Sequence, residues 1–469
     1  MKHVAIIGAG ISGLASAVLL KDAAAQRGLA LTITVLEKEA RPGGKISSHH
    51  EDGYLCESGP NGFLDSKTAT LELCGKVALT DALMRSSDNA RKRFLWSEKT
   101  LHRLPENAFS FFASPLMSWR GKARLAAELF VPPARDETDE TLAHFVRRRL
   151  GAEALEKLVG PMASGVFAGD PEEMSIASSF PRIKQLERDY GGLIRALLAL
   201  QRRHRQDRRM GKAVSGPSGP GGKLTSFAQG IQTLVDTLAA KLSENLVLGT
   251  EVQSIRKGPD GFILHCSHDP EFKADVVISA CPAYALSTFG APLDTRLAAL
   301  AGQISYAPLA VVCCGYPRKQ VPHDLNGFGF LVTRNSQQAL LGTLWDSSIF
   351  EHRAPRGKVL LRSMAGGALH PQTLELPDEE LLRQVRESLK TILGIEHAPE
   401  MVKIYRHPQA IPRYRVGHAR LLDEMRERAK HLPGFFFTGN AFEGVGINDC
   451  VAAAGRTAEK VLNFLSGDL

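Results

Sequence analysis

Short runs of hydrophobic residues, separated by glycine-rich turns and helical patterns, recur along this chain of 469 residues. An apolar run at residues 4–7 leads directly into the turn Gly8-Ala9-Gly10-Ile11-Ser12-Gly13, and a helical pattern follows from residue 14 to about residue 25. A second apolar run, at residues 31–36, ends at Glu37. This order of strand, glycine-rich turn, helix and strand predicts a βαβ unit that holds a dinucleotide.

The end of the chain carries a related pattern. Phenylalanines at residues 435–437 precede Thr438-Gly439-Asn440, and the glycine-rich segment 444–449 leads into a helix. Glycine-rich turns and helix N-termini bind phosphates through their backbone amides. We therefore expect both ends of the chain to contribute to one site for a long, phosphate-bearing ligand.

The pattern between these ends predicts two further parts. Helical periodicity dominates residues 103 to about 195, whereas residues 286–420 mix strands and helices, as a separate substrate domain would. The strongest helical segments are residues 120–130, 141–150 and 152–162. The uncharged run 297–317 fits a helix that turns into a buried strand better than a membrane span, so no transmembrane helix is predicted.

Residues 193–285 connect these parts. Helices are predicted at 193–210 and 231–242, and the segment 215–222 between them is too rich in glycine and proline for regular structure, which indicates a loop or linker. Strands are predicted at residues 246–252, 261–266 and 275–280. In a two-domain protein that holds a dinucleotide, a strand that returns to the nucleotide domain in this region would place the backbone of Val252 beside the adenine.

Together these patterns predict an α/β fold: a Rossmann-like domain of the type that holds a dinucleotide, a mixed α+β substrate domain and a mainly helical domain. The nucleotide domain is assigned residues 1–88, 226–285 and 430–469. The substrate-binding domain is assigned residues 89–102, 195–225 and 286–429. The helical domain is assigned residues 103–194.

Composition places the protein among soluble globular chains. Its seven cysteines are scattered and form no C-x-x-C pair, which indicates a reducing compartment and predicts no metal site. The first strand follows Met1-Lys2-His3 directly, so we expect no signal peptide and a cytoplasmic protein, with the cytoplasmic face of a membrane as the alternative location.

The net charge of +8 is concentrated in two runs, at residues 147–149 and 202–212. Neither run is interleaved with aromatics, so we expect no nucleic-acid partner and favour solvated helix faces, with a negatively charged membrane as the alternative. An aromatic cluster follows residue 108 and is flanked by cations, a pattern typical both of a peripheral membrane helix and of domain core. The cluster and its cations are Phe109, Phe111, Phe112, Leu116, Met117 and Trp119, with Arg120, Lys122 and Arg124.

The residues after the second strand identify the dinucleotide. Glu37 can accept hydrogen bonds from a ribose diol, and Arg41-Pro42-Gly43-Gly44-Lys45 follows it in an E-x-x-x-R-x-G-G pattern. A second glycine pair lets more backbone lie against the cofactor, and this suits a permanently held FAD better than an exchanging nicotinamide. The cofactor-binding residues predicted here are Gly8, Gly10, Ile11, Ser12, Gly13, Glu37, Lys38, Arg41, Gly43, Gly44 and Lys45.

Further blocks along the whole chain resemble the FAD-containing, oxygen-dependent protoporphyrinogen oxidases of the amine-oxidase and phytoene-desaturase superfamily. The blocks are Glu57-Ser58-Gly59-Pro60-Asn61-Gly62-Phe63, Ser164-Gly165-Val166-Phe167-Ala168-Gly169-Asp170-Pro171, Gly327-Phe328-Gly329-Phe330-Leu331-Val332, Ile411-Pro412-x-Tyr414-x-x-Gly417-His418 and Gly444-Val445-Gly446-Ile447-Asn448-Asp449-Cys450. Each block alone is weak evidence, whereas their occurrence in this order is specific.

The resemblance implies that protoporphyrinogen IX is oxidised to protoporphyrin IX in heme biosynthesis. Three hydrides would pass to flavin N5, with molecular oxygen as acceptor and hydrogen peroxide as product. Arg93 matches the arginine that holds a substrate propionate, and Leu331 and Met364 match residues that clamp the macrocycle. The implied substrate-binding residues are Arg93, Phe167, Ala168, Gly169, Gly329, Leu331 and Met364, and no acid or base is assigned because the cofactor carries the redox chemistry.

The same resemblance extends the cofactor site to Gly59, Pro60, Asn61, Gly62, Val252, His407, Val445, Gly446 and Ile447. The sequence departs from the pattern twice: some relatives have tryptophan near His407, and others have arginine where this chain has Asn61.

Three alternatives stay open. The first is coproporphyrinogen III, although a single arginine at the mouth suits two propionates better than four. The second is a related flavin amine oxidase or desaturase, and the third is a non-enzymatic prenyl or lipid escort on the same fold. The chain is also expected to contact a membrane peripherally and to form a homodimer.

Overall fold

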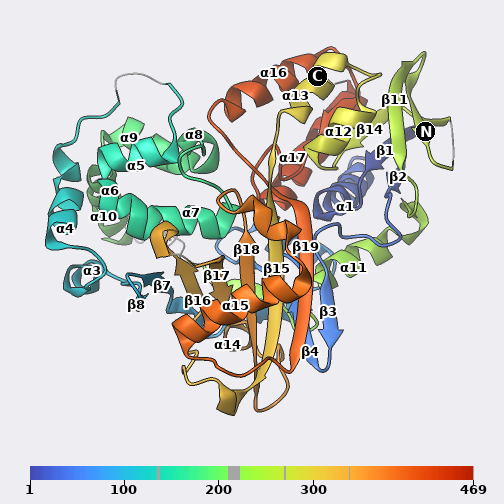
Figure 1. The fold of residues 1–469 in the computed structure, drawn as a ribbon. Coiled ribbons are helices and arrows are strands. Elements are labelled where there is room, and N and C mark those ends of the chain that lie inside the picture. Colours follow the sequence, from blue (N-terminus) through green and yellow to red (C-terminus); the bar gives the residue numbers. More distant parts are fainter. Residues whose placement is uncertain (135–137, 210–221, 269–270, 337, 468–469) are drawn as a thin grey trace.

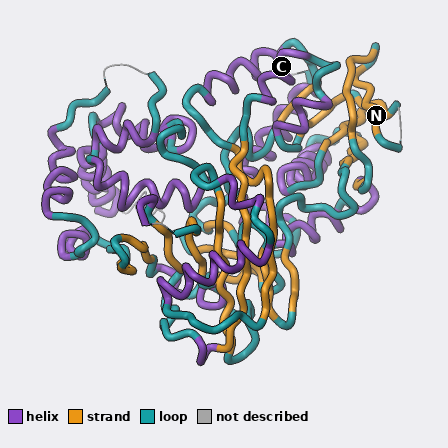
Figure 2. Tube along the Cα trace, viewed as in Figure 1, coloured by secondary structure: helices purple, strands orange, loops and turns teal. Residues whose placement is uncertain are grey.

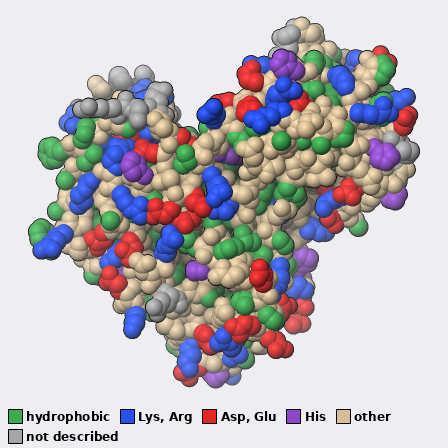
Figure 3. All heavy atoms as spheres, turned by 45° about the horizontal axis from the view of Figure 1, so that its top comes forward, with side chains coloured by type: hydrophobic (Ala, Val, Ile, Leu, Met, Phe, Trp, Pro, Cys, Tyr) green, Lys and Arg blue, Asp and Glu red, His purple; other side chains and the backbone are tan. Residues whose placement is uncertain are grey.

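The computed structural model describes residues 1–134, 138–209, 222–268, 271–336 and 338–467, and the predicted linker at 215–222 lies almost wholly outside them. The chain forms three parts: a nucleotide-binding part that contains both termini, a strand-rich part below it and a helical part to one side (Figures 1 and 2). In the space-filling view, a notch separates the helical part from the nucleotide-binding part (Figure 3).

A five-stranded parallel sheet forms the centre of the nucleotide-binding part. Its order is β10 (Leu246–Val247), β2 (Leu31–Leu36), β1 (Lys2–Ile7), β14 (Val276–Ser279) and β20 (Phe435–Phe437). Because β14 pairs with both β1 and β20, the two ends of the chain lie on either side of one strand. The predicted meeting of the two ends is thereby confirmed.

Helices cover both faces of this sheet, since successive residues of a strand point to opposite sides. In β1, Val4 and Ile6 pack on one side with α1 (Ile11–Gln26) and α17 (Ile447–Ser466), whereas Ala5 and Ile7 pack on the other. The first side also holds α2 (Ala69–Lys76) and α11 (Gln232–Lys241). The second holds β11 (Val252–Gly258), β12 (Gly261–Cys266), β13 (Phe272–Ala274), α12 (Ala283–Phe289), α13 (Thr295–Gly302) and α16 (His418–Lys430).

A mixed seven-stranded sheet forms the strand-rich part. Its order is β19 (Met401–Pro412), β15 (Tyr306–Pro317), β18 (Lys358–Gly366), β17 (Leu340–Leu344), β16 (Gly329–Val332), β7 (Phe94–Ser97) and β8 (Thr100–Arg103). Helix α15 (Asp378–Leu393) covers one face, through a core that includes Leu381, Val385 and Leu389. The other face is left for the remaining two parts of the molecule (Figure 1).

Short elements join the nucleotide-binding part to the seven-stranded sheet. They are β3 (Ser48–Glu51), β4 (Tyr54–Glu57), β5 (Phe63–Leu64), β6 (Leu83–Arg85), β9 (Leu224–Phe227) and α14 (Asp346–Ile349). The helical part packs around Phe145, Leu155 and Phe167. It contains α3 (Ala108–Ala113), α4 (Trp119–Ala126), α5 (Leu142–Arg149), α6 (Ala152–Ala154), α7 (Gly160–Phe167), α8 (Ile176–Ser179), α9 (Pro181–Tyr190) and α10 (Leu193–Arg209).

Several elements differ from the sequence-based expectation. The predicted strand 246–252 is divided between β10 and β11, because Gly249 adopts a positive φ of +66°. The predicted helix 152–162 is interrupted by a π-helical turn over Leu155–Val159 ahead of Pro161, whose ring lacks the N–H that a continuous helix needs. The sequence pattern assigns residues 195–225 to the substrate-binding domain. In the structure, however, α10 packs against α9 in the helical part.

The run Arg147–Arg149 was predicted to be a solvated helix face, but only Arg147 of the three arginines is exposed. Arg149 is fully buried: it is ion-paired with Glu128 and donates to the backbone carbonyls of Val131 and Pro132 at 3.1 and 3.0 Å. Glu128 also accepts hydrogen bonds from the first backbone amides of α10. The sequence conceals this network because its acidic partner lies about twenty residues away.

Replacing Arg149 with methionine should destabilise the helical part by about 3–5 kcal/mol, since it leaves the Glu128 carboxylate buried without its cation. The midpoint of urea unfolding, followed by circular dichroism, measures this loss. Arg147→Met is the matched control, because its exposed pair with Glu172 should contribute less than about 1 kcal/mol. Equal losses in the two variants would contradict the buried network.

Candidate active site

The first glycine-rich turn is shaped to leave open space in front of α1. Gly8 has a φ of +99°, and a Cβ on Gly13 would lie only 1.9 Å from the carbonyl oxygen of Gly8. A Cβ on Gly10, in contrast, would meet no atom within 4 Å. The fold therefore requires glycine at residues 8 and 13, whereas Gly10 borders a space that a diphosphate can enter, beside the N-terminal amides of Ile11, Ser12 and Gly13.

Glu37 and the second glycine pair lie against this turn. Glu37 is buried, and its carboxylate accepts hydrogen bonds from the backbone N–H of Ala9 at 2.7 Å and of Glu39 at 3.0 Å. The backbone N–H of Gly43 donates to the carbonyl of Ala9 at 2.8 Å. Glu37 is thus fixed where the turn meets the end of β2, the place at which a ribose diol is held in such folds.

The two neighbouring cations have other positions than the sequence suggests. Lys38 is exposed beside Glu39. The Arg41 guanidinium donates to the carbonyl of Gly44 at 2.8 Å and to that of Pro42 at 3.2 Å, so it braces its own loop. The contribution of Arg41 is therefore to the shape of the Gly43-Gly44 turn.

Lys45 is a half-buried cation that forms no ion pair within the described residues. Its Nζ donates to the carbonyl of Ala410 at 2.8 Å and lies 5.1 Å from the centre of the Tyr306 ring. Burial lowers the pKa of Lys45 to about 8. An anionic cofactor bound beside it would supply the missing negative charge.

The Gly59-Pro60-Asn61-Gly62 segment is held from below by the seven-stranded sheet. Arg362, fully buried on β18 and ion-paired with Asp346 at 2.8 Å, donates to the carbonyl of Gly59. His407 on β19 contacts the carbonyl of Ser58 at 2.8 Å, and burial lowers the pKa of its ring, so it is neutral at pH 7. The side-chain N–H₂ of Asn61 is buried with no hydrogen-bond partner in the described residues, which fits an acceptor atom of a bound cofactor.

The C-terminal segment reaches the same region. Tyr414 accepts a hydrogen bond from the backbone N–H of Gly444 at 2.9 Å, and Val445 packs against the core of the helical part together with Leu331. Gly446 directly precedes α17, which begins at Ile447. Val252 is buried at the start of β11, in the core that also contains Leu36 at the end of β2. Direct contacts thus join several predicted segments: Gly44 lies against Gly10, Gly59 lies against Lys45, and Gly439 in the C-terminal segment lies near Ser12.

The sheet face opposite α15 carries the predicted substrate residues. Leu331 is paired in register with Gly342, and Gly342 with Met364, so two large apolar side chains share a face with a glycine between them. Gly329 has a φ of +135° and adds no side chain at the start of β16. Ala168 and Leu341 pack in one cluster with Met364. Ala168 belongs to the Phe167-Ala168-Gly169 turn, at which α7 ends. These residues form an apolar surface on this face of the sheet.

Arg93 lies at the edge of this face, directly before β7. Arg93 is exposed, and its guanidinium stacks 5.5 Å from the centre of the Phe328 ring. Partial loss of water around the guanidinium lowers the pKa of Arg93 from its ordinary value. Arg93 forms no ion pair with any residue that the structure describes. Unlike Arg93, the arginines that line a neighbouring cavity of about 450 Å³ are ion-paired. Arg147 is paired with Glu172, and Arg334 is paired with Asp170.

Sequence reasoning missed two residues of the site. Arg362 is a charged residue directly after the apolar run Val359-Leu360-Leu361, within a region of predicted strands and helices, and such an interruption could have marked it as a buried, partnered cation. Tyr414 belongs to the segment 411–418 that carries part of the family resemblance, but nothing in the sequence indicates the partners of its hydroxyl. Within the described residues, no group of three or more metal-ligating side chains lies close enough to hold a metal ion, and no helix is long and apolar enough to cross a membrane.

Comparisons with known proteins agree with this geometry. The model of the family described as flavin containing amine oxidoreductase matches residues 11–462. A coproporphyrinogen III oxidase of Bacillus subtilis is 32% identical over 99% of this chain and 98% of that protein. A chloroplastic protoporphyrinogen oxidase of Nicotiana tabacum is also 32% identical, over 98% of this chain and 85% of that protein.

Solved structures give the same result. A crystal structure from Exiguobacterium, whose description as a protoporphyrinogen oxidase is provisional, superimposes with a TM-score of 0.82 at 28% identity over 99% of both chains. A putrescine oxidase structure superimposes with a TM-score of 0.70 at 18% identity over 98% of this chain and 99% of that one, which shows a shared fold alone.

The affinity for FAD should depend on the protonation of Lys45. The ammonium attracts an anionic cofactor, and its pKa without cofactor is about 8. Binding should therefore be strong and constant below pH 8, and the dissociation constant should rise as the pH increases from 8 to 10. Fluorescence titration of the cofactor-free protein measures this, and Lys45→Met should bind more weakly and without that rise. The same pH dependence in Lys45→Met would contradict the role of this side chain.

Proposed function

The chain belongs to the flavin-containing amine oxidoreductase family and is an FAD-dependent oxidoreductase, and from this premise we propose that it oxidises protoporphyrinogen IX to protoporphyrin IX in heme biosynthesis. One observation carries the choice of substrate. An apolar sheet face, with Leu331 and Met364 on either side of Gly342, lies beside a cation, Arg93, that forms no ion pair with any residue that the structure describes. A porphyrinogen is a large apolar ring with carboxylates on one side.

The proposed mechanism assigns positioning to the protein. FAD, when bound, would supply an acceptor for three successive hydrides, with molecular oxygen taking up the electrons as hydrogen peroxide. Arg93 binds a propionate and so fixes which edge of the ring lies deepest. Leu331, Leu341, Met364 and Ala168 exclude water from the reacting carbon.

No side chain needs to act as a strong base, since the pyrrole nitrogen stabilises the cation that hydride loss leaves behind. The carbonyl oxygen of Ala168 accepts one hydrogen bond, from the backbone N–H of Ala368 at 2.7 Å. That of Gly169 accepts one from Ser164 Oγ at 3.2 Å. Each oxygen retains a second lone pair, which can hold a pyrrole N–H in the turn formed by Phe167, Ala168 and Gly169.

Coproporphyrinogen III is the second candidate substrate, because relatives from Bacillus subtilis and Staphylococcus aureus carry that name. Four propionates call for more than one unpaired cation. Arg147 and Arg334 are already neutralised by Glu172 and Asp170, whereas Arg93 is unpaired among the described residues. The charge arrangement therefore favours the dicarboxylate.

Peripheral contact with a membrane is part of the proposal, and the helical part supports it. Phe109, Trp119 and Phe130 are 85%, 73% and 79% exposed, whereas Leu116 and Met117 are buried. The aromatic cluster thus divides into a core half and a surface half. Lys122 and Arg124, expected to flank it as free cations, donate instead to backbone carbonyls, so apolar burial would provide most of the attraction. A cytoplasmic location and a homodimer complete the proposal.

The test of the substrate is anaerobic reduction of the yellow flavoprotein by proto- and by coproporphyrinogen. We expect protoporphyrinogen to bleach the flavin and to give the higher kcat/KM. Arg93→Ala should raise the Michaelis constant by about tenfold or more with a smaller change in kcat, because a propionate contact stabilises ground and transition states alike. Arg91→Ala is the control, because its exposed side chain lies only two residues away. Failure of both porphyrinogens to bleach the flavin would refute the proposal.

A further inference from the structure

Tyr414 is a buried residue in the connection between β19 and α16. Its hydroxyl donates to the carbonyl of Asn440 and accepts from the backbone N–H of Gly444 at 2.9 Å. Its ring stacks on His418, with the ring centres 4.4 Å apart and an interplanar angle of 15°. One phenol therefore closes both ends of the turn that precedes Val445.

Only a hydroxyl can make this pair of contacts at Tyr414. Burial raises the pKa of the Tyr414 phenol above its ordinary value, so it remains protonated and can donate as well as accept. Gly444 has a φ of +118°, and a Cβ there would lie 2.6 Å from the Cβ of Asp449. The carboxylate of Asp449 in turn accepts from the backbone N–H of Gly446 at 3.3 Å. The turn is thus fixed from both sides.

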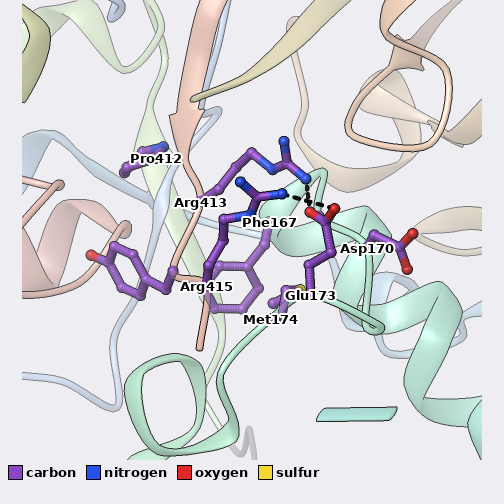
Figure 4. Close-up of a pocket in the computed structure, with 9 residues that line it drawn as sticks. Phe167, Asp170, Glu173, Met174, Pro412, Arg413 and Arg415 are labelled. Atoms are coloured by element: carbon purple, nitrogen blue, oxygen red, sulfur yellow. Dashed lines mark hydrogen bonds and ion pairs between the residues drawn. The ribbon is translucent and has the colours of Figure 1, made fainter. Parts of the chain in front are cut away.

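The main chain around Tyr414 also anchors the helical part. The carbonyl of Tyr414 accepts a hydrogen bond from the backbone N–H of Ser175 at 2.8 Å. Arg413 and Arg415 both point to Glu173 and form ion pairs with it (Figure 4). Asp139 accepts from the Ser175 hydroxyl at 2.7 Å and from the backbone N–H of Gly417 at 3.0 Å. Residues 413–417 are therefore the attachment of the helical part to the nucleotide-binding part.

We propose that Tyr414 is a positioning residue that sets the Val445-Gly446-Ile447 turn against the cofactor and couples that turn to the docking of the helical part. The turn precedes α17, whose N-terminus faces the cofactor space, and Val445 packs against the same helical core as Leu331. The proposal rests on the placement of FAD beside this turn and is independent of which porphyrinogen is oxidised.

Tyr414→Phe tests the proposal, because it keeps the stacking on His418 and removes only the hydroxyl. We expect the dissociation constant for FAD to rise at least tenfold, since two buried backbone groups lose their partner. The visible flavin absorption bands should shift, and KM for protoporphyrinogen at saturating FAD should change less than twofold. Tyr405→Phe, on β19, is the matched control, because its buried hydroxyl has no hydrogen-bond partner among the described residues.

Equal FAD affinity and identical spectra in Tyr414→Phe and Tyr405→Phe would overturn the proposal. If Tyr414→Phe does not fold, Asp139→Ala tests the same coupling, because Asp139 joins Ser175 of the helical part to Gly417. This variant should raise the dissociation constant for FAD about threefold, and an affinity equal to that of the unaltered protein would then overturn the proposal. The FAD titrations and the flavin spectra require no porphyrinogen, so they stay informative if the proposed substrate is wrong.

Discussion

The parallel pairing of β1, β14 and β20 is the constraint on which the rest of the site depends. In a parallel sheet, all strands end at the same edge, so the turns after β1 and β20 open at one edge with only β14 between them, although about 430 residues separate them. Helices α1 and α17 start from these turns, and their N-terminal dipoles both favour negative charge at that edge. A phosphate-bearing cofactor is therefore attracted to the point where the chain closes on itself.

The seven-stranded sheet supports this closure from below. Arg362 on β18 and His407 on β19 each contact a backbone carbonyl of the segment 58–59, and Lys45 reaches back to the carbonyl of Ala410 on β19. The same sheet presents Leu331 and Met364 on the face that we assign to the substrate. In the proposed mechanism, this one sheet would position both cofactor and substrate, which is the geometric demand of hydride transfer without a dedicated acid or base.

Local patterns in the sequence were sufficient for much of this arrangement. The strand 31–36 has its predicted bounds, the run 297–317 is divided into α13 and β15 as expected, and Gly43 lies against the first turn. These features depend on neighbouring residues, and periodicity and glycine spacing report on them directly. The roles of Arg149 and Tyr414 depend on partners that are distant along the chain, so no local pattern could indicate them. The same holds for the first backbone amides of α10, which donate to Glu128 about 65 residues earlier in the chain. For Arg362, a charge inside an apolar run could indicate burial, but it could not identify the partners Asp346 and Gly59.

Hydrogen exchange of the protein with and without FAD tests the central claim most directly, because it reports on separate segments at once. If the two ends of the chain enclose one cofactor, FAD should slow exchange at residues 8–13 and 440–447 together, with residues 59–62 following them. Protection confined to residues 8–13 would contradict the account, since the C-terminal turn would then have no part in holding the cofactor.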